Sequence, residues 1–318
     1  MTPHRRLSLE RIAEAATVID PVFLDSPQFL AESLGAELGC RLVVKVETMN
    51  PIRSFKARGT EFLTASLEGK PHLTCATAGN FGQGMAWSAR KRGLPITVFS
   101  ATTANPLKVE RMRALGAEVR QVGSDFDEAH RAATEFAKSS GARLVEDGRD
   151  VAIAEGAGTI GCELVRWPEP FDSVVVPLGD GALLAGIAHW MKSHSPRTRM
   201  VGVCASGAPA MERSWRAGEP CELPARTIAD GIAVTSPFPE ALDDITGVVD
   251  DVALVDDTSI VAAIRQAHAD LGIVLEPAGA AALAAVMTDP DRFRGQLVAA
   301  ILSGGNATAE QLRSWLTA

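Results

Sequence analysis

The sequence lacks paired cysteines. Its five cysteines are scattered through 318 residues as Cys40, Cys75, Cys162, Cys204 and Cys221, and no two of them form a CxxC pair. This spacing argues against a disulfide framework and against a zinc site, and the six histidines indicate no metal cluster. We therefore expect no metal and, by default, a protein of the reducing cytosol.

Long uncharged runs and an excess of positive charge are also missing. No uncharged stretch reaches the length of a membrane span, and the charged N-terminal segment has no apolar core of the kind a secretion signal needs. The formal net charge is -8, from 31 basic and 39 acidic residues. We expect neither a membrane nor nucleic acid as a partner.

What is present indicates a globular α/β protein. Hydrophobic residues make up 46% of the chain and charged residues 22%, and the length allows two domains. Between residues 72 and 145, short strand-like runs alternate with helical patterns of about ten residues or more, which predicts a parallel sheet flanked by helices. We expect a small domain over residues 65–146, and a large domain built from residues 1–64 and 147–318.

Lys56 is the candidate for chemistry. It follows a strand-like run at 42–46 and a turn fixed by Pro51, and it opens a helical pattern for which Ser54 is the expected N-cap. A lysine near the positive end of a helix, with Phe55 beside it, should have a lowered pKa, as a Schiff base with an aldehyde cofactor requires. The alternative is an ordinary solvated lysine in a first helical turn.

The best candidate for a phosphate site is the segment 173–182. A buried strand, SVVVP, leads through the small-residue loop LGDG into a helix, an order that presents backbone N–H groups to an anion. Asp180 argues against this function, because a carboxylate repels a phosphate. We therefore expect its side chain to point out of the site and to bond backbone amides, a basic side chain or water. A simple tight turn is the alternative.

A second glycine stretch, GAGTIG at 156–161, matches the dinucleotide-binding pattern G-x-G-x-x-G. Asp180 lies at the distance at which that pattern places an acidic residue, so an NAD-dependent dehydrogenase is a competing hypothesis. Against it, Pro168 would end the following helix after barely two turns, and the apolar run before Gly156 is short. The segment 151–166 as a whole is predicted to be helical despite its glycines.

Three shorter loops complete the inventory. TAGNFGQG, at 77–84, joins a strand to a helix, so its amides are suited to a carboxylate. Gly231 offers a position where a flat ring can approach the backbone, and Ser303 follows the last predicted strand, where ligands of parallel sheets bind. Each loop alone is more often just a turn, but together with Lys56 they favour a common site.

In this order, these segments resemble the pyridoxal-phosphate (PLP) enzymes of fold type II, the tryptophan synthase β-like fold. The most similar branch is the threonine/serine dehydratases and serine racemases. The resemblance extends from about Ile19 to Asn306 and rests on the words SFKARG, TAGNFGQG, GTIGCEL, VVVPLGDGALLAGIA, TIADGIAV, EPAGAAALAAV and LSGGN. It implies two domains with parallel-rich sheets and the cofactor in the cleft between them.

The resemblance also implies site residues. Lys56 would be the catalytic residue and covalent anchor, Asn80 would bond the phenolic oxygen of PLP, and Ser303 would face its pyridine nitrogen. The implied cofactor-binding residues are Phe55, Lys56, Asn80, Gly179, Asp180, Gly181, Ala182, Leu183, Gly231, Glu276 and Ser303. The implied substrate-binding residues are Thr77, Ala78, Gly79, Asn80, Phe81 and Gln83.

The chain departs from the family pattern at several of these positions. Phe81 stands where the family usually has histidine, and Asp180 and Ala182 stand where it has glycines. Ala78 replaces the serine that racemases use as an acid/base, which disfavours racemisation. Ala205 and Ser206 stand where racemases have a cation ligand, and we expect no regulatory C-terminal domain of the kind found in biosynthetic threonine dehydratases.

The implied reaction is β-elimination. A serine at the pyridine nitrogen favours elimination over reactions that need a long-lived carbanion, and Lys56 would also act as general base. We expect a lyase that converts a β-hydroxy amino acid such as L-threonine or L-serine to a 2-oxo acid and ammonia, as a homodimer. The alternatives are serine racemisation, another β-elimination or β-replacement, the dehydrogenase, and a cofactor-binding protein without turnover.

Overall fold

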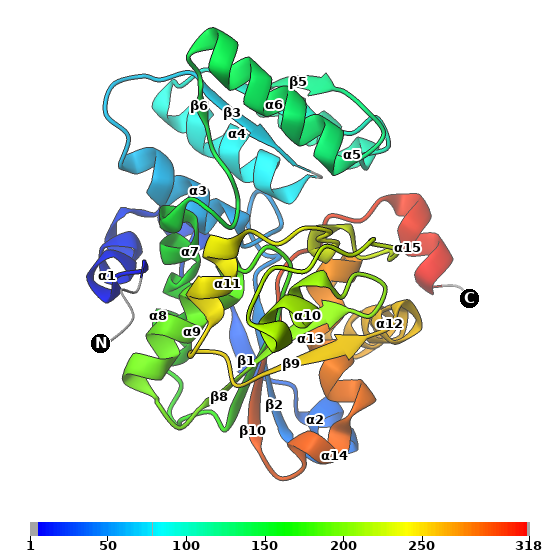
Figure 1. Cartoon of the computed structure of the whole chain (residues 1–318). Helices are drawn as coiled ribbons and strands as arrows, with labels where there is room; N and C mark the ends of the chain where they lie inside the picture. The colour runs from blue at the N-terminus through cyan, green and yellow to red at the C-terminus, as the bar shows by residue number, and fades with distance from the viewer. Residues whose placement is uncertain (1–5, 78, 317–318) are drawn as a thin grey trace.

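A six-stranded sheet lies at the centre of the larger part of the molecule (Figure 1). The structure is a computed structural model that describes residues 6–77 and 79–316. β1 pairs with β2 antiparallel, and every other neighbouring pair is parallel. In spatial order the strands are β1 (Gln28–Leu30), β2 (Arg41–Val46), β10 (Leu297–Leu302), β7 (Ser173–Pro177), β8 (Arg199–Ala205) and β9 (Asp251–Val255). β7 and β10 are buried throughout, as expected of parallel strands that helices cover on both faces.

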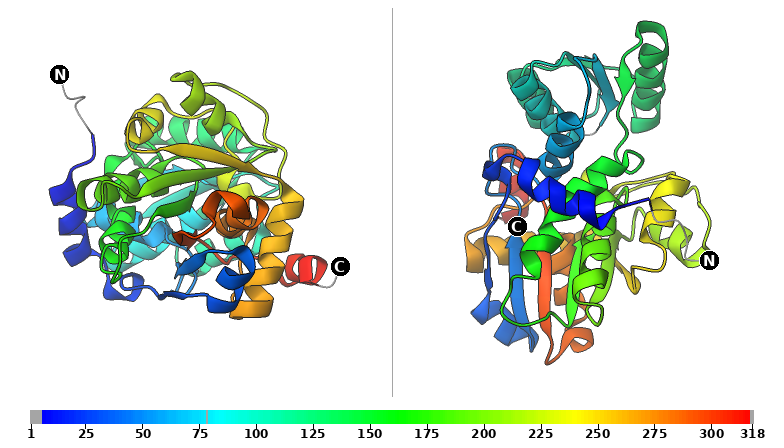
Figure 2. Two further views of the ribbon diagram at one scale, coloured as in Figure 1. Left: turned by 90° about the horizontal axis from the view of Figure 1, so that it is seen from below. Right: turned by 90° about the vertical axis from the view of Figure 1, so that its left-hand side faces the viewer.

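A second sheet has four strands, all parallel. In spatial order they are β5 (Glu118–Gln121), β4 (Ile96–Ser100), β3 (Leu73–Ala76) and β6 (Arg143–Leu144). With α4, α5 and α6 it forms the upper body in Figure 1, and the right-hand view of Figure 2 shows this body standing on the rest of the chain. The predicted alternation of strands and helices between residues 72 and 145 is confirmed.

Helices surround both sheets. In chain order they are α1 (Leu9–Val18), α2 (Glu32–Leu38), α3 (Lys56–Ala65), α4 (Asn80–Arg92), α5 (Pro106–Ala114), α6 (Phe126–Ser140), α7 (Val151–Ala157), α8 (Thr159–Leu164), α9 (Ala182–His194), α10 (Ala210–Ala217), α11 (Pro239–Ile245), α12 (Asp257–Leu271), α13 (Pro277–Thr288), α14 (Pro290–Phe293) and α15 (Ala309–Leu316), with short 3-10 helices η1 (Pro21–Phe23) and η2 (Asp230–Ile232). None of the helices in the described residues is long and apolar enough to cross a membrane.

Helix α13 packs against the large sheet and positions the loop that follows β10. Its residues from Pro277 to Val286 are buried, which their small, mostly alanine side chains allow. Gly279 is needed for this approach, because a Cβ there would lie 2.0 Å from the carbonyl oxygen of Gly304. The close packing brings Glu276, just before the helix, next to Gly304, whose carbonyl oxygen accepts the Glu276 N–H at 3.1 Å.

A buried ionic network joins α3 to the large sheet. The Arg58 guanidinium is fully buried, and it donates to Glu47 at the end of β2 and to Glu163 on α8. Lys45 on β2 also bonds Glu163. Because Arg58 lies two residues after Lys56, this network fixes the start of α3.

The glycine stretch 156–161 lies within two helices. The segment before it, Val151–Ala157, is helix α7 and not a strand, and α8 ends at Leu164. A Cβ at Gly156 would lie 2.5 Å from the carbonyl oxygen of Arg58, so this glycine allows α7 to pack against α3. The dinucleotide-binding pattern requires a strand, a tight turn and a long helix, so the structural basis of the dehydrogenase hypothesis is wrong.

Candidate active site

A cavity of about 330 Å³ lies where loops from both sheets meet. Thr77 follows β3, Gly179 follows β7 and Ser303 follows β10, so the cavity lies at the carboxyl ends of parallel strands, where such sheets bind ligands. The predicted site residues that line it are Phe55, Lys56, Thr77, Gly79, Asn80, Phe81, Gly179, Asp180, Gly181, Leu183, Gly231, Glu276 and Ser303. Ala182 and Gln83 are not among the lining residues, and Ala78 lies outside the described part of the chain.

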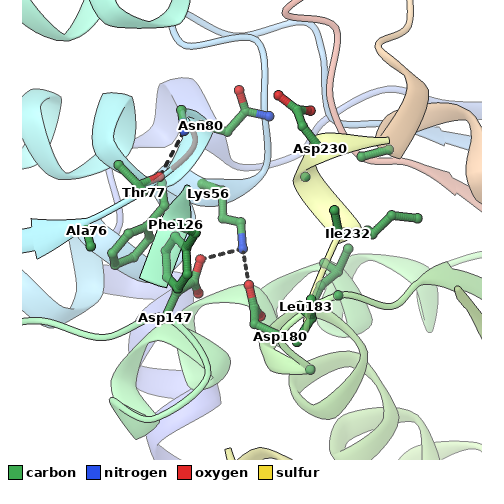
Figure 3. Close-up of a pocket in the computed structure, with 18 of the residues that line it drawn as sticks. Lys56, Ala76, Thr77, Asn80, Phe126, Asp147, Asp180, Leu183, Asp230 and Ile232 are labelled. Atoms are coloured by element: carbon green, nitrogen blue, oxygen red, sulfur yellow. Dashed lines mark hydrogen bonds and ion pairs between the residues drawn. The ribbon is translucent and has the colours of Figure 1, made fainter. Parts of the chain in front are cut away.

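Lys56 is the first residue of α3, and its side chain reaches into this cavity (Figure 3). The N-cap is Phe55 and not Ser54 as predicted, although the Ser54 hydroxyl accepts a hydrogen bond from the Lys56 N–H at 3.3 Å. The Phe55 ring centre lies 4.8 Å from Lys56 Nζ, so the predicted aromatic neighbour is present. These contacts hold the amine at one wall of the cavity.

Two carboxylates contact the Lys56 amine directly. Nζ lies 2.5 Å from Asp147 Oδ2 and 2.9 Å from Asp180 Oδ2 (Figure 3). Burial disfavours the ammonium, but the charges of Asp147 and Asp180 outweigh burial and raise the pKa of Lys56 above its usual value. The predicted fall of this pKa is therefore wrong for this structure, because the sequence did not reveal the two carboxylates.

The pKa of Asp147 is raised as well, but in a carboxyl group this shift favours the neutral form. Burial and the nearby Asp180 raise the pKa of Asp147 to about 7, against the opposing effect of Lys56. Its Oδ1 atom is buried and has no hydrogen-bond partner within the described structure. A carboxyl group of this kind is suited to exchange a proton with the amine beside it near neutral pH.

Asp180 points into the cavity and not away from it. Its Oδ2 contacts Lys56, and its Oδ1 accepts the Ala182 N–H at 2.9 Å. The predicted partners, a backbone amide and a basic side chain, are confirmed, but the predicted outward direction is wrong. The carboxylate engages one of the backbone amides, at the start of α9, that were expected to face a phosphate.

A second ionic cluster, of the buried Lys108 and Glu276 and the partly exposed Asp230, also lines the cavity. Lys108 Nζ lies 2.8 Å from Asp230 Oδ2 and 2.9 Å from Glu276 Oε2, and Asn80 also bonds Glu276. The Lys108 side chain passes over Gly79, where a Cβ would lie 2.1 Å from Lys108 Cδ. Glycine at position 79 is therefore required for Lys108 to line the cavity.

The loop expected to bind a substrate carboxylate leads into α4, a helix of 13 residues that begins at Asn80. The Thr77 hydroxyl accepts the Gly79 N–H at 2.9 Å, which shapes the loop. Phe81 is buried at the cavity wall, and Gln83 is fully buried behind Asn80 with its Oε1 unpartnered among the described residues. The positive end of α4 therefore faces the cavity, as an anion requires.

Several lining residues were not predicted from the sequence. Among them are Asp147, Lys108, Phe126, His130 and the segment 233–238. Asp147 had a usable signal, because it follows β6 closely and so lies at the carboxyl edge of a parallel sheet. Lys108 lies within α5 and had none.

Comparison with known proteins identifies relatives along most of the chain. A model of the family "Pyridoxal-phosphate dependent enzyme" matches residues 19–304. An L-threonine ammonia-lyase of Thermotoga maritima is 34% identical over 304 residues, which are 94% of this chain and 76% of that protein. The biosynthetic L-threonine dehydratase of Lactococcus lactis is 30% identical over 311 residues, which are 94% and 75% of the two chains.

Solved structures agree with these relatives. Threonine deaminase isoform 2 of Solanum lycopersicum superimposes with a TM-score of 0.90 at 29% identity, over 98% of this chain and 88% of that one. Maize serine racemase superimposes with a TM-score of 0.90 at 26% identity, over 98% and 97% of the two chains. The predicted fold type II architecture and the predicted cofactor are confirmed.

The residues around the cavity fit the aldehyde and the ring of pyridoxal phosphate and leave one conflict at its phosphate. An amine, an amide and a hydroxyl are present as Lys56, Asn80 and Ser303, and they line one cavity. The loop before α9 is free of large side chains, with Gly179 and Gly181 flanking Asp180, but the Asp180 carboxylate lies inside it. The cofactor's phosphate fits there if the Asp180 side chain turns away, or if Asp147 and Asp180 share a proton that removes one of their charges.

Proposed function

Because this chain belongs to the family of pyridoxal-phosphate dependent enzymes, we propose that it catalyses the dehydration and deamination of a β-hydroxy amino acid such as L-threonine or L-serine. The products would be a 2-oxo acid and ammonia. The names of the threonine ammonia-lyase and threonine dehydratase relatives support this reaction. The observation that carries the proposal is the Lys56 amine, held in the cavity between Asp147 and Asp180.

The bound cofactor would withdraw electrons from the substrate's Cα, so that its proton becomes acidic. Lys56 would anchor the cofactor, and its amine, once released, would take the Cα proton as general base. Asn80 and Ser303 would hold the two sides of the cofactor ring. A serine can bond the ring nitrogen without keeping it protonated, which supports elimination over reactions that need a long-lived carbanion.

Protons would move between Lys56 and Asp147. The 2.5 Å separation of Lys56 Nζ and Asp147 Oδ2 allows direct transfer. In the free site the proton stays on Lys56, because the two carboxylates raise the pKa of its amine. Asp147 would accept this proton only once the bound cofactor lowers the basicity of the amine, and would return it afterwards. Its pKa of about 7 makes both protonation states accessible at neutral pH.

The loop 77–83 would hold the carboxylate of the substrate. Thr77, Ala78, Gly79, Asn80, Phe81 and Gln83 keep this proposed role. The positive end of α4 supports it. Phe55, Gly179, Asp180, Gly181, Ala182, Leu183, Gly231 and Glu276 would surround the cofactor.

The test is reductive labelling. The purified protein is reduced with borohydride and digested, and each lysine-containing peptide is analysed by mass spectrometry. We expect loss of the visible absorption and a pyridoxyl mass on Lys56. Lys108 is the matched internal control, because it is a second buried lysine of the same cavity.

A label on Lys108, or no label, would contradict the proposal. Turnover is then measured as 2-oxo acid and ammonia from L-serine and L-threonine. A labelled protein that releases neither product would favour the cofactor-binding protein without turnover, for which the position of Asp180 is the supporting observation. Comparable amounts of D-serine and pyruvate from L-serine would favour a racemase instead.

We also propose the finer assignments of compartment, assembly and domains. The five cysteines are all free, which supports a reducing cytosol. A homodimer and a division into 1–64 with 147–318 and 65–146 remain proposals, which gel filtration and limited proteolysis would test. The separate four-stranded sheet supports that division.

A further inference from the structure

An aromatic cluster lies at the mouth of the cavity. Phe126 begins α6, and its ring stacks on His130 one turn later, with ring centres 5.9 Å apart and planes 21° apart. Phe238, from the segment before α11, lies 6.3 Å from the His130 ring. All three residues line the cavity, and they come from both halves of the molecule.

The cluster is held in place by polar contacts behind it. His130 Nε2 lies 2.8 Å from Glu146 Oε1, and Arg149 bonds the other oxygen of Glu146. The Arg149 guanidinium also lies 5.2 Å from the Phe238 ring centre. The ring of Phe126 remains accessible, because the residue is 47% exposed. Figure 3 shows it beside Thr77 and Asp147, on the side of the cavity where the substrate loop lies.

An isolated exposed phenylalanine is common at protein surfaces and has no functional meaning. Phe126 differs because apolar side chains from other segments of the chain line the same cavity. They are Val145, Ile232, Ala233, Val234, Pro237 and Phe238. A substituent that leaves the reacting centre in this direction would contact aromatic and aliphatic surface.

The charges at the same mouth are unsuited to an anionic substituent. Asp125, Asp127 and Glu146 line it. Among the described residues that line the cavity, the lysines are Lys56 and Lys108, and each already contacts two carboxylates. A second carboxylate on the substrate would therefore lie near like charges. The nearby Arg149 guanidinium is already paired with Glu146 and Glu240.

We infer that the substrate is a β-hydroxy amino acid with an aromatic group on Cβ, such as L-threo-3-phenylserine, and that Phe126 and Phe238 determine this specificity. The inference rests on the proposed β-elimination. The substrate's aromatic ring would pack against the cluster, with its carboxylate at the loop 77–83 and its Cα near Lys56.

The first test compares kcat/KM of the holoenzyme for five substrates. They are L-serine, L-threonine, L-threo-3-phenylserine, L-threo-3-hydroxyaspartate and L-2,3-diaminopropionate. We expect 3-phenylserine to exceed L-serine by at least about tenfold, in the range by which pockets distinguish apolar groups, and hydroxyaspartate to be the poorest. Preference for diaminopropionate would mean that the acidic residues select a cation, and would overturn the inference.

The second test measures binding without turnover. L-Phenylalanine and L-alanine have no β-hydroxyl, so each can be titrated against the holoenzyme by the change in its visible absorption. Phe126→Ala and Phe238→Ala should each weaken L-phenylalanine binding by about threefold to tenfold, the contribution of one aromatic pair, and leave L-alanine unchanged. Phe29→Ala is the matched control, because Phe29 is 39% exposed on β1 and does not line the cavity.

The failures of the two proposals are distinguishable. If Lys56 is labelled and L-serine or L-threonine is turned over faster than 3-phenylserine, the specificity is wrong and the β-elimination stands. Equal losses of L-phenylalanine and L-alanine binding in Phe126→Ala and Phe238→Ala would also overturn the proposed aromatic specificity. If no substrate is turned over and Lys56 carries no label, the proposed reaction itself fails.

Discussion

At the scale of single residues, Asp180 decides how the cavity accepts a phosphate. Its carboxylate forms an ion pair with Lys56 and accepts a hydrogen bond from the Ala182 N–H at the start of α9. Two unit charges about 4 Å apart repel by roughly 4 kcal/mol at an effective dielectric constant of about 20. We therefore expect Asp180→Gly to raise the affinity of the apoprotein for pyridoxal phosphate by more than about tenfold, or about 1.4 kcal/mol, measured by absorbance titration.

Asp180→Asn separates charge from shape in this experiment. The amide oxygen can still accept the Ala182 N–H, so a gain equal to that of Asp180→Gly would assign the effect to charge. An affinity that stays within a factor of ten in both variants would mean that the side chain turns away when the cofactor binds. Pyridoxal, which lacks the phosphate, should respond little to either substitution.

Asp147 should make the stability of the apoprotein depend on pH. Its pKa rises from 3.8 to about 7 on folding, so the folded state favours the protonated form. The stabilisation of the folded state by protonated Asp147 is therefore fully present below pH 3.8. It decreases as the pH rises and is gone above about pH 7. Asp147→Asn should remove the part of the fall in unfolding free energy with rising pH that Asp147 causes.

Urea unfolding at several pH values between 4 and 8 measures the effect. The groups that face Asp147 are Lys56, Asp180 and the buried Cys75 thiol. All three residues are kept in both the variant and the parent. Identical slopes of unfolding free energy against pH in the variant and the parent would show that Asp147 titrates in its ordinary range.

At the scale of elements, the start of α3 depends on Arg58. This fully buried guanidinium bonds Glu47 and Glu163, which are themselves buried. Removing it leaves two carboxylates without their main partner, so Arg58→Ala should lower the free energy of unfolding by about 3–5 kcal/mol. Chemical denaturation of the apoprotein checks this directly.

The matched control is Arg41→Ala. Arg41 also makes a two-pronged pair with Glu169, but both side chains are about half exposed. Its loss should change the unfolding free energy by less than about 1 kcal/mol. Equal effects of the two substitutions would show that burial of the Arg58 network adds nothing to its strength.

Elements whose signals are local were predictable from the sequence. The expected strands at 42–46 and 173–177 correspond to β2 and β7, because apolar runs mark strands that are buried on both faces. The expected helix at 151–166 is two helices, α7 and α8, with Gly158 at their junction. The loops around Lys56, Thr77, Gly179 and Ser303 were also identified, and the fold brings them to one cavity.

The electrostatics of the cavity were not predictable in the same way. Lys56 and Asp147 are 91 positions apart in the chain, and Lys108 meets Asp230 across 122 positions. No local pattern specifies such contacts, and they reverse the direction of the pKa shift expected for Lys56. The inward direction of Asp180 has the same origin, since Lys56 attracts it.

At the scale of the whole molecule, the cavity is where the two sheets are joined. Its walls come from loops after β3 and β6 on the four-stranded sheet and from loops after β7 and β10 on the six-stranded sheet. A ligand that touches both sets of loops binds the folded arrangement and not the unfolded chain. Cofactor binding should therefore stabilise the whole molecule against unfolding.

Removing the cofactor is the corresponding prediction. At a concentration of about 100 times the Kd, a ligand that binds only the folded state adds about 2.7 kcal/mol. For a chain of this size we expect the Tm of the apoprotein to lie at least a few degrees below that of the holoenzyme, measured by scanning calorimetry. Adding pyridoxal phosphate back should restore the higher value.

Lys56→Ala distinguishes the covalent anchor from the rest of the cavity. If the contacts of both sheets matter, this variant should still gain stability from pyridoxal phosphate, at higher concentrations than the parent needs. Pyridoxal, without the phosphate, should stabilise the variant less, because the loop before α9 then has no anion to bind. A cofactor that loads onto Lys56 in the parent but leaves its Tm unchanged would show that it binds the unfolded chain as well as the folded one.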